Sequence, residues 1–191
     1  MARFAIRFAS LALLLASGHA AGAATMPLYD AFHTLCAATD AQPDLIAKAI
    51  KISPFKITPR TTASTPGPIP ISVALWDMEV EGHKMSLAIG RSQEPMGTAM
   101  ITDTQTCTVT SFGNEDASIG AIRKWAGLPG KGSDLTLYEF QLQGGKRIAL
   151  EHGDAEIAAK TEGRARHIAI ITRSNLGSVM LSRYLPPHPA P

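Results

Sequence analysis

One stretch, Thr104–Pro129, constrains the fold of this chain more than any other part of its sequence. Its first nine residues, TQTCTVTSF, place threonine at every second position from Thr104 to Thr110, with Cys107 and Val109 between them. Because successive side chains of a β-strand point to opposite faces, this alternation predicts a strand with one apolar and one threonine-rich face. Such a pattern is typical of a half-buried antiparallel strand.

The second half of this stretch predicts a turn followed by an amphipathic helix. Gly113-Asn114 interrupts the strand, and the acidic residues Glu115 and Asp116 follow, where they suit the start of a helix. Gly127 is typical of a helix end. One face of the helix carries apolar residues at a spacing of three to four, namely Ile119, Ile122, Trp125 and Ala126. We interpret Trp125 as a core residue in preference to a partner-binding residue.

The first 24 residues predict a secretory signal peptide. Arg3 and Arg7 give a basic start, Phe8–Ala16 is apolar but too short to span a bilayer, and small residues around Ala21-Gly22-Ala23 form a cleavage site. An uncleaved N-terminal anchor is the alternative. No later stretch is apolar for long enough to be a transmembrane helix. We therefore expect a soluble protein that is periplasmic or secreted.

Removal of the predicted signal peptide would change the charge balance of the chain. The whole sequence has 18 basic and 16 acidic residues, but residues 1–24 contain two arginines and no acid, so 16 of each remain. A neutral, mixed surface argues against nucleic acid as a partner and against strong attraction to anionic lipid. We expect an envelope protein or a small ligand as the partner, and no cofactor.

The two cysteines, Cys36 and Cys107, are expected to form a disulfide, because an even count in an exported protein favours one. It would close a loop of about 70 residues and stabilise the fold by about 4 kcal/mol in the chain-entropy model. Two buried thiols or a redox pair are the alternatives, although the cysteines do not form a CxxC motif.

The remaining chain predicts helices first and hairpins afterwards. Pro27–Ile52 is expected to be helical in two pieces, and Ile57–Pro70, rich in threonine and proline, to be a loop, an edge or a mobile arm. A short helix is expected around Ala155–Lys160. The other strands are expected at Ile71–Val80, Lys84–Arg91, Gly97–Thr102, Leu135–Gln143, Lys146–His152, Arg166–Arg173 and Ser178–Tyr184, with Asp103 in a turn.

These elements predict an α+β fold. We expect an antiparallel sheet of about eight strands in hairpins, packed with two or three helices and tied by one disulfide. Residues 25–185 form the expected single domain, between the signal peptide of residues 1–24 and a disordered tail of residues 186–191.

An acidic stripe is the most suggestive cluster of polar residues. Asp77, Glu79 and Glu81 occupy alternate positions before His83, so a strand would place the three carboxylates on one face. Hard oxygen donors of this kind bind divalent cations, and close carboxylates can serve acid–base chemistry. The alternative, which we favour, is the solvated face of an edge strand, because no EF-hand-type loop accompanies the stripe.

Methionines and histidines offer a second, softer set of metal ligands. Met78, Met85, Met96 and Met100 surround His83 in the sequence, and thioether with imidazole is a copper-binding combination. Methionine more often fills a core. His33 with Cys36 would be a metal pair only if Cys36 were not in a disulfide.

A hydrolase is the remaining chemical alternative. His152, between Glu151 and Asp154, could act as a base together with Asp77 or Glu79. The chain has no G-x-S-x-G nucleophile motif, phosphate-binding loop or dinucleotide fingerprint. No catalytic residue is therefore assigned.

The signal sequence, the cysteine in AFHTLCAATD and the cysteine in TCTVTSF together resemble small secreted proteobacterial proteins of unknown function. The resemblance implies an exported, disulfide-tied α+β domain and no activity. We expect a non-catalytic domain that binds a ligand or partner in the periplasm, with a small hydrolase and a metal carrier as the alternatives.

Overall fold

The computed structural model describes residues 25–65, 71–96, 99–113, 115–151, 153–173 and 175–190. The predicted signal peptide (residues 1–24), the end of the Thr/Pro-rich segment (residues 66–70) and His152 lie outside these ranges. The helical elements are α1 (Pro27–Phe32), the π-helical turn η1 (His33–Ala37), α2 (Pro43–Ile52), α3 (Asp116–Ala126) and α4 (Asp154–Thr161).

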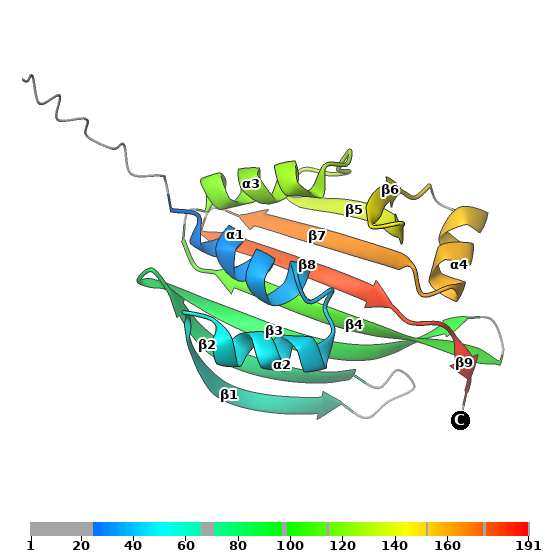
Figure 1. The fold of residues 1–191 in the computed structure, drawn as a ribbon, viewed down its shortest axis with the longest axis horizontal. Coiled ribbons are helices and arrows are strands. Elements are labelled where there is room, and N and C mark those ends of the chain that lie inside the picture. Colours follow the sequence, from blue (N-terminus) through cyan, green and yellow to red (C-terminus); the bar gives the residue numbers. More distant parts are fainter. Residues whose placement is uncertain are drawn as a thin grey trace, which may run out of the picture.

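Nine strands of the described chain form a single antiparallel sheet, in the order β1-β2-β3-β4-β8-β7-β5-β6, with β9 paired to β4. Figure 1 shows α1 and α2 lying across the sheet, α3 beside β7 and β5, and α4 at the opposite end of these strands from the N-terminus of α3. This arrangement confirms the predicted α+β fold. The strands are β1 (Lys56–Thr65), β2 (Ile71–Val80), β3 (His83–Met96), β4 (Met100–Ser111), β5 (Leu135–Gln143), β6 (Lys146–Ala149), β7 (Ala165–Arg173), β8 (Leu176–Tyr184) and β9 (His188–Pro189).

One face of the sheet carries the main core, and we call it the covered face. Across it, Cys107 of β4 lies in register with Ile89 on one side and Leu181 on the other. The row continues through Ile168 to Tyr138. Because α1, η1 and α3 pack on these side chains, Leu28, Phe32, Leu35 and Ile122 are fully buried there. The period-2 pattern of the sequence is therefore realised over most of the sheet.

The opposite face, which we call the second face, is polar at its centre. Thr108 pairs with Met180, and Thr110 exchanges a hydroxyl hydrogen bond with Ser178 at 2.9 Å. Near the start of β7, α4 covers a corner of this face. A small second core lies there, made of Leu150, Ala159, Ala165 and Tyr184.

Helix α3 ends where its sequence predicts. Gly127 adopts φ = 66°, the left-handed region, and its amide donates to the carbonyl of Arg123. At the start, Glu115 occupies the N-cap position but makes no capping hydrogen bond, because its carboxylate binds other groups described below.

Asp103 does not form the predicted turn. β4 runs without interruption from Met100 to Ser111, so the strands expected at Gly97–Thr102 and Thr104–Phe112 are one strand. Asp103 is tolerated inside it because Arg91 and Gln93 of β3 donate to its carboxylate at 2.9 and 3.1 Å.

Two segments with little predicted regular structure form strands in the described chain, namely β1 and β9. Of the alternatives for Ile57–Pro70, the edge holds for its first part: β1 pairs with β2, and the register shifts between Pro59 and Thr61. The expected disordered tail instead forms β9, where His188 pairs with Ile101 and Pro189 with Met100. His188 also reaches the carboxylate of Asp103 at 3.3 Å, which helps to hold this segment.

No helix in the described part of the chain is both long and apolar enough to cross a membrane.

Candidate functional site

The structure separates the acidic stripe into surface ion pairs. Asp77 and Glu79 lie on β2, and each pairs with a basic residue of the edge strand β1. Asp77 lies 3.7 Å from Arg60, and Glu79 lies 3.1 Å from Lys56. Glu81 lies in the turn between β2 and β3 with φ = 49°. Among the described residues, the stripe does not converge on a metal site. The favoured interpretation is correct in that Asp77 and Glu79 form solvated ion pairs, but their strand β2 is not an edge strand, because β1 pairs with it on one side and β3 on the other.

The four methionines do not form one cluster with His83. Met78 and Met85 pair across β2 and β3 and are buried in the core. Met96 and Met100 pair at the other end of β3 and β4. His33 stacks on Tyr29 with ring centroids 5.5 Å apart. Methionine packing, which the sequence already favoured, accounts for Met78 and Met85.

The disulfide prediction is confirmed. Cys36 of η1 and Cys107 of β4 are bonded and fully buried, with their Cα atoms 5.3 Å apart. His33 and Cys36 therefore cannot act as a metal pair.

Trp125 contacts the core, as its spacing predicts. Its indole meets Phe32 edge to face at 5.6 Å, and the guanidinium of Arg147 lies 3.8 Å above its ring. Arg147 also donates to the Trp125 carbonyl at 2.9 Å. The Trp125 side chain thus packs against the core, and Arg147 binds the backbone carbonyl at the C-terminal end of α3.

His83 leaves the acidic stripe and contacts a buried carboxylate at the start of α3. The Glu115 side chain is only 3% exposed, and its two oxygens accept hydrogen bonds from Ser111 at 2.7 Å and Ser118 at 2.9 Å. His83 Nδ1 lies 3.6 Å from Oε1 of the same carboxylate. Two hydroxyl donors fix the carboxylate in one orientation.

This cluster contains a serine, a histidine and an acid, but their order differs from that of a hydrolytic triad. In a triad the hydroxyl bonds to the imidazole, and the acid orients the imidazole from its other side. Here Ser111 donates to Glu115, so its hydroxyl is bonded to the acid and not to the base. The geometry therefore supports a fixed negative charge better than an activated nucleophile.

A hollow of about 730 Å³ opens beside this carboxylate, where the N-terminus of α3 meets the ends of β5, β7 and β8. We call it the α3 hollow. Its size falls within the range of small-molecule sites, roughly 300 to 1,000 Å³. Its lining includes Glu115, Asp116, Asp134, Arg173, Ile119 and Leu176.

Strand pairing assembles the α3 hollow from distant parts of the sequence. The backbone amide of Thr172 donates to the Asp134 carbonyl at 2.9 Å, which brings Asp134 next to Arg173. Gly177 permits the close approach of α1 and α3, because a Cβ atom there would lie 3.0 Å from Leu28 and 3.2 Å from Glu115. Sequence reasoning identified Glu115 only as a helix-start residue and did not single out Asp134 or Arg173.

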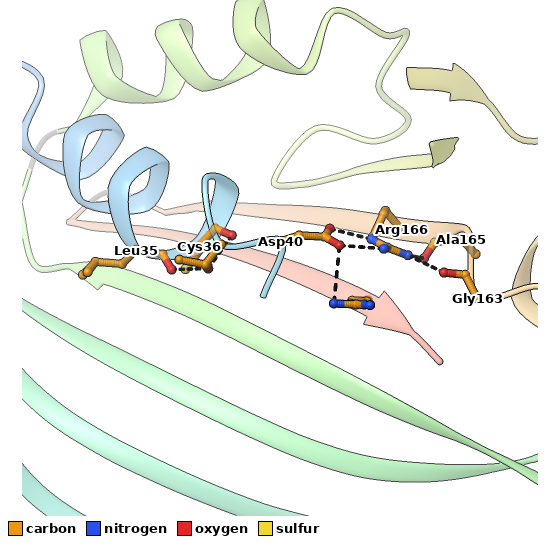
Figure 2. Close-up of polar contacts among 8 residues, drawn as sticks. Leu35, Cys36, Asp40, Gly163, Ala165 and Arg166 are labelled. Atoms are coloured by element: carbon orange, nitrogen blue, oxygen red, sulfur yellow. Dashed lines mark hydrogen bonds and ion pairs between the residues drawn. The ribbon is translucent and has the colours of Figure 1, made fainter. Parts of the chain in front are cut away.

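A second polar cluster, partly buried, lies beside the disulfide, where Asp40 reaches Arg166 (Figure 2). Asp40 accepts two hydrogen bonds from Arg166 at 2.6 Å each, and Arg183 lies 3.6 Å away. Arg166 also donates to the carbonyls of Gly163 and Ala165. Asp40 and Arg166 satisfy one another, whereas Nε of Arg183 is buried without a hydrogen-bond partner among the described residues. Because the cluster joins the segment after η1 to β7 and β8, we assign it to structure.

Comparisons of the chain with protein-family models, with curated proteins and with solved structures find no match.

Proposed function

We propose that this protein is an exported, non-catalytic binding domain, and that its α3 hollow binds a small polar ligand carrying a positively charged group. The observation that carries the proposal is the hollow itself, whose described lining contains three acidic residues, Glu115, Asp116 and Asp134, and one basic residue, Arg173. Of the two kinds of partner that the sequence leaves open, this favours a small ligand over an envelope protein.

The charge and rigidity of the hollow support an amine or guanidinium as the recognised group. Ser111 and Ser118 hold the Glu115 carboxylate in place, so a cation that reaches it meets a preorganised acceptor. Arg173 adds a contact for an anionic group at the other end of the ligand. Ile119 and Leu176 supply apolar contacts between these charges.

A binding role is preferred over the hydrolase alternative. Asp77 and Glu79, two of its proposed acid–base groups, are engaged with Arg60 and Lys56 at the sheet edge. The hydroxyl of Ser111 is bonded to the acid of the buried cluster. Both observations favour recognition over chemistry.

Export is supported by the disulfide and by the N-terminal sequence. A buried disulfide between distant segments is typical of proteins from oxidising compartments. The resemblance to small secreted proteobacterial proteins points the same way, and we propose a periplasmic or secreted location.

The test uses calorimetric titration of the full chain with agmatine, which carries an amine and a guanidinium, and with succinate as the anionic control. We expect agmatine to bind and succinate not to bind. Asp134→Asn should weaken agmatine binding about tenfold, which corresponds to about 1.4 kcal/mol.

Lys56→Gln, at the distant sheet edge, is the matched control and should leave agmatine binding unchanged. The proposal fails if agmatine does not bind, or if it binds Asp134→Asn and Glu115→Gln as tightly as it binds the unaltered protein.

A further inference from the structure

A cluster of metal-ligating side chains, separate from the α3 hollow, lies under α4 on the second face. Glu139 of β5 and His167 of β7 are direct cross-strand neighbours, and α4 brings Glu156 over them. The ligand atoms of these three residues all lie within 4.8 Å of one another. Among the described residues, this is the one group of three or more such side chains that meets this distance.

We infer that Glu139, Glu156 and His167 form a binding site for a divalent transition-metal ion of the zinc type. The site has two carboxylate oxygens and one imidazole nitrogen, each from a different element of the fold. Zinc accepts both kinds of ligand. Three protein ligands leave a coordination position for water or for a ligand of the metal.

The hydrogen bonding of His167 supports a ligand role. Its Nδ1 lies 3.2 Å from the hydroxyl of Tyr184, whereas its Nε2 is buried and has no hydrogen-bond partner. A metal-binding histidine characteristically donates its second ring N–H to a neighbouring group, which fixes the tautomer and the ring orientation. With the proton on Nδ1 donated to Tyr184, the lone pair of Nε2 is available to a metal.

The buried Nε2 is also unusual without a partner of some kind. Polar atoms hidden from solvent are nearly always hydrogen-bonded, because an unsatisfied one loses its hydration without compensation. A metal at this position would satisfy it. This observation is independent of the distances among the three ligands.

The separations within the cluster fit a metal after small side-chain movements. Bonds of about 2.1 Å in a tetrahedral site place the donor atoms roughly 3.4 Å apart. The two glutamates have several rotatable bonds, so the present separation of up to 4.8 Å can contract without movement of the backbone.

Two lysines compete with a metal for the carboxylates. Lys160 lies 3.0 Å from Oε1 of Glu156, and Lys131 lies 3.7 Å from Oε2 of Glu139. The Lys160 ammonium also sits 4.5 Å from the centre of the Tyr184 ring. A dication would repel Lys160, so the site predicts that removal of this positive charge strengthens metal binding.

The test measures Zn²⁺ affinity of the full chain by calorimetry after dialysis against EDTA, with Mg²⁺ as a control cation that is poorly suited to imidazole. We expect Zn²⁺ to bind and to raise the melting temperature, and Mg²⁺ to do neither. Glu156→Gln and His167→Asn should each weaken Zn²⁺ binding at least tenfold. Lys160→Gln should strengthen it several-fold.

Two controls separate this site from other effects. His83→Gln alters a histidine beside a different carboxylate, and Asp134→Asn alters the α3 hollow, so both should keep the affinity of the unaltered protein for Zn²⁺. Co²⁺ titration adds a spectroscopic readout, because its visible absorption reports the ligand set and should change in Glu139→Gln and Glu156→Gln even if His167→Asn fails to fold.

The inference is overturned if Zn²⁺ does not bind the unaltered protein. It is equally overturned if Glu139→Gln and Glu156→Gln both leave the Zn²⁺ affinity and the Co²⁺ spectrum unchanged, since the metal would then lie elsewhere. Neither outcome depends on whether agmatine binds to the α3 hollow.

Discussion

Among single residues, Asp40 has an electrostatic role that the sequence did not reveal. It adopts φ = 51°, which asparagine also tolerates, and its carboxylate accepts two hydrogen bonds from Arg166, whose side chain is 6% exposed. Burial lowers the pKa of the neighbouring Arg183, whereas the charge of Asp40 raises it. One carboxylate thus offsets two poorly solvated guanidinium groups.

Asp40→Asn should therefore destabilise the protein by about 3 kcal/mol, because it leaves the buried charge of Arg166 without compensation while keeping the backbone conformation accessible. Urea unfolding followed by circular dichroism measures this change. Lys56→Gln, which breaks the solvent-exposed pair with Glu79, is the control and should change stability by less than about 1 kcal/mol. Equal effects of the two substitutions would contradict the assigned role of Asp40.

At the scale of elements, local sequence signals predicted the bounds of several strands and helices. Ile71–Val80 and Leu135–Gln143 were expected and are found as β2 and β5, because alternation and turn residues agree there. The threonine-rich β1 was predicted only within a segment described as a loop, an edge or a mobile arm, because its pairing with β2 depends on the fold rather than on propensity. Asp103 was misplaced for the same reason, because its partners lie on two other strands.

Asp103 links β3, β4 and β9, and this link predicts a pH dependence. Burial acts to raise the pKa of Asp103, but hydrogen bonds from Gln93 and Arg91 outweigh it, and the net pKa lies below the ordinary value of 3.8. A carboxyl with a depressed pKa in the folded state stabilises the protein above its unfolded pKa, and this contribution is lost as the pH falls through the folded pKa.

The melting temperature of the unaltered protein should consequently exceed that of Asp103→Asn at pH 6, and the two should converge between pH 4 and about pH 2. Arg91→Gln removes one of the groups that lower the pKa, so its loss of stability should begin at a higher pH. Calorimetric scans from pH 6 downward measure both effects. Parallel curves for the unaltered protein and Asp103→Asn would show that Asp103 contributes no such linkage.

At the scale of the whole molecule, the sequence predicted the fold class and the disulfide but not the order of the strands. β8 pairs with β4 although α3, β5, β6, α4 and β7 lie between them in the sequence. No local sequence pattern predicts this long connection. The candidate sites depend on it: Asp134 meets Arg173 in the α3 hollow, and Glu139 meets His167, only because β5 pairs with β7. The sequence therefore pointed only to the helical residues of the α3 hollow, such as Glu115, and to none of the three residues of the cluster under α4.

The disulfide is the one covalent link across this topology. Cys36 and Cys107 are 71 residues apart, and their bond ties η1 to the central strand β4, enclosing α2 and β1 to β3 in the loop. In the chain-entropy model, a loop of this length is worth about 4 kcal/mol, because the bond restricts the unfolded chain.

Replacement of both cysteines by alanine should lower the free energy of unfolding by about 4 kcal/mol. Each single replacement should have nearly the same effect as the double one, since either abolishes the loop closure. Denaturant unfolding measures the loss, and alkylation of the unaltered protein in denaturant without reductant should modify no thiol. Two alkylated thiols, or a double variant as stable as the unaltered protein, would mean that the sheet and its helices hold together without the bond.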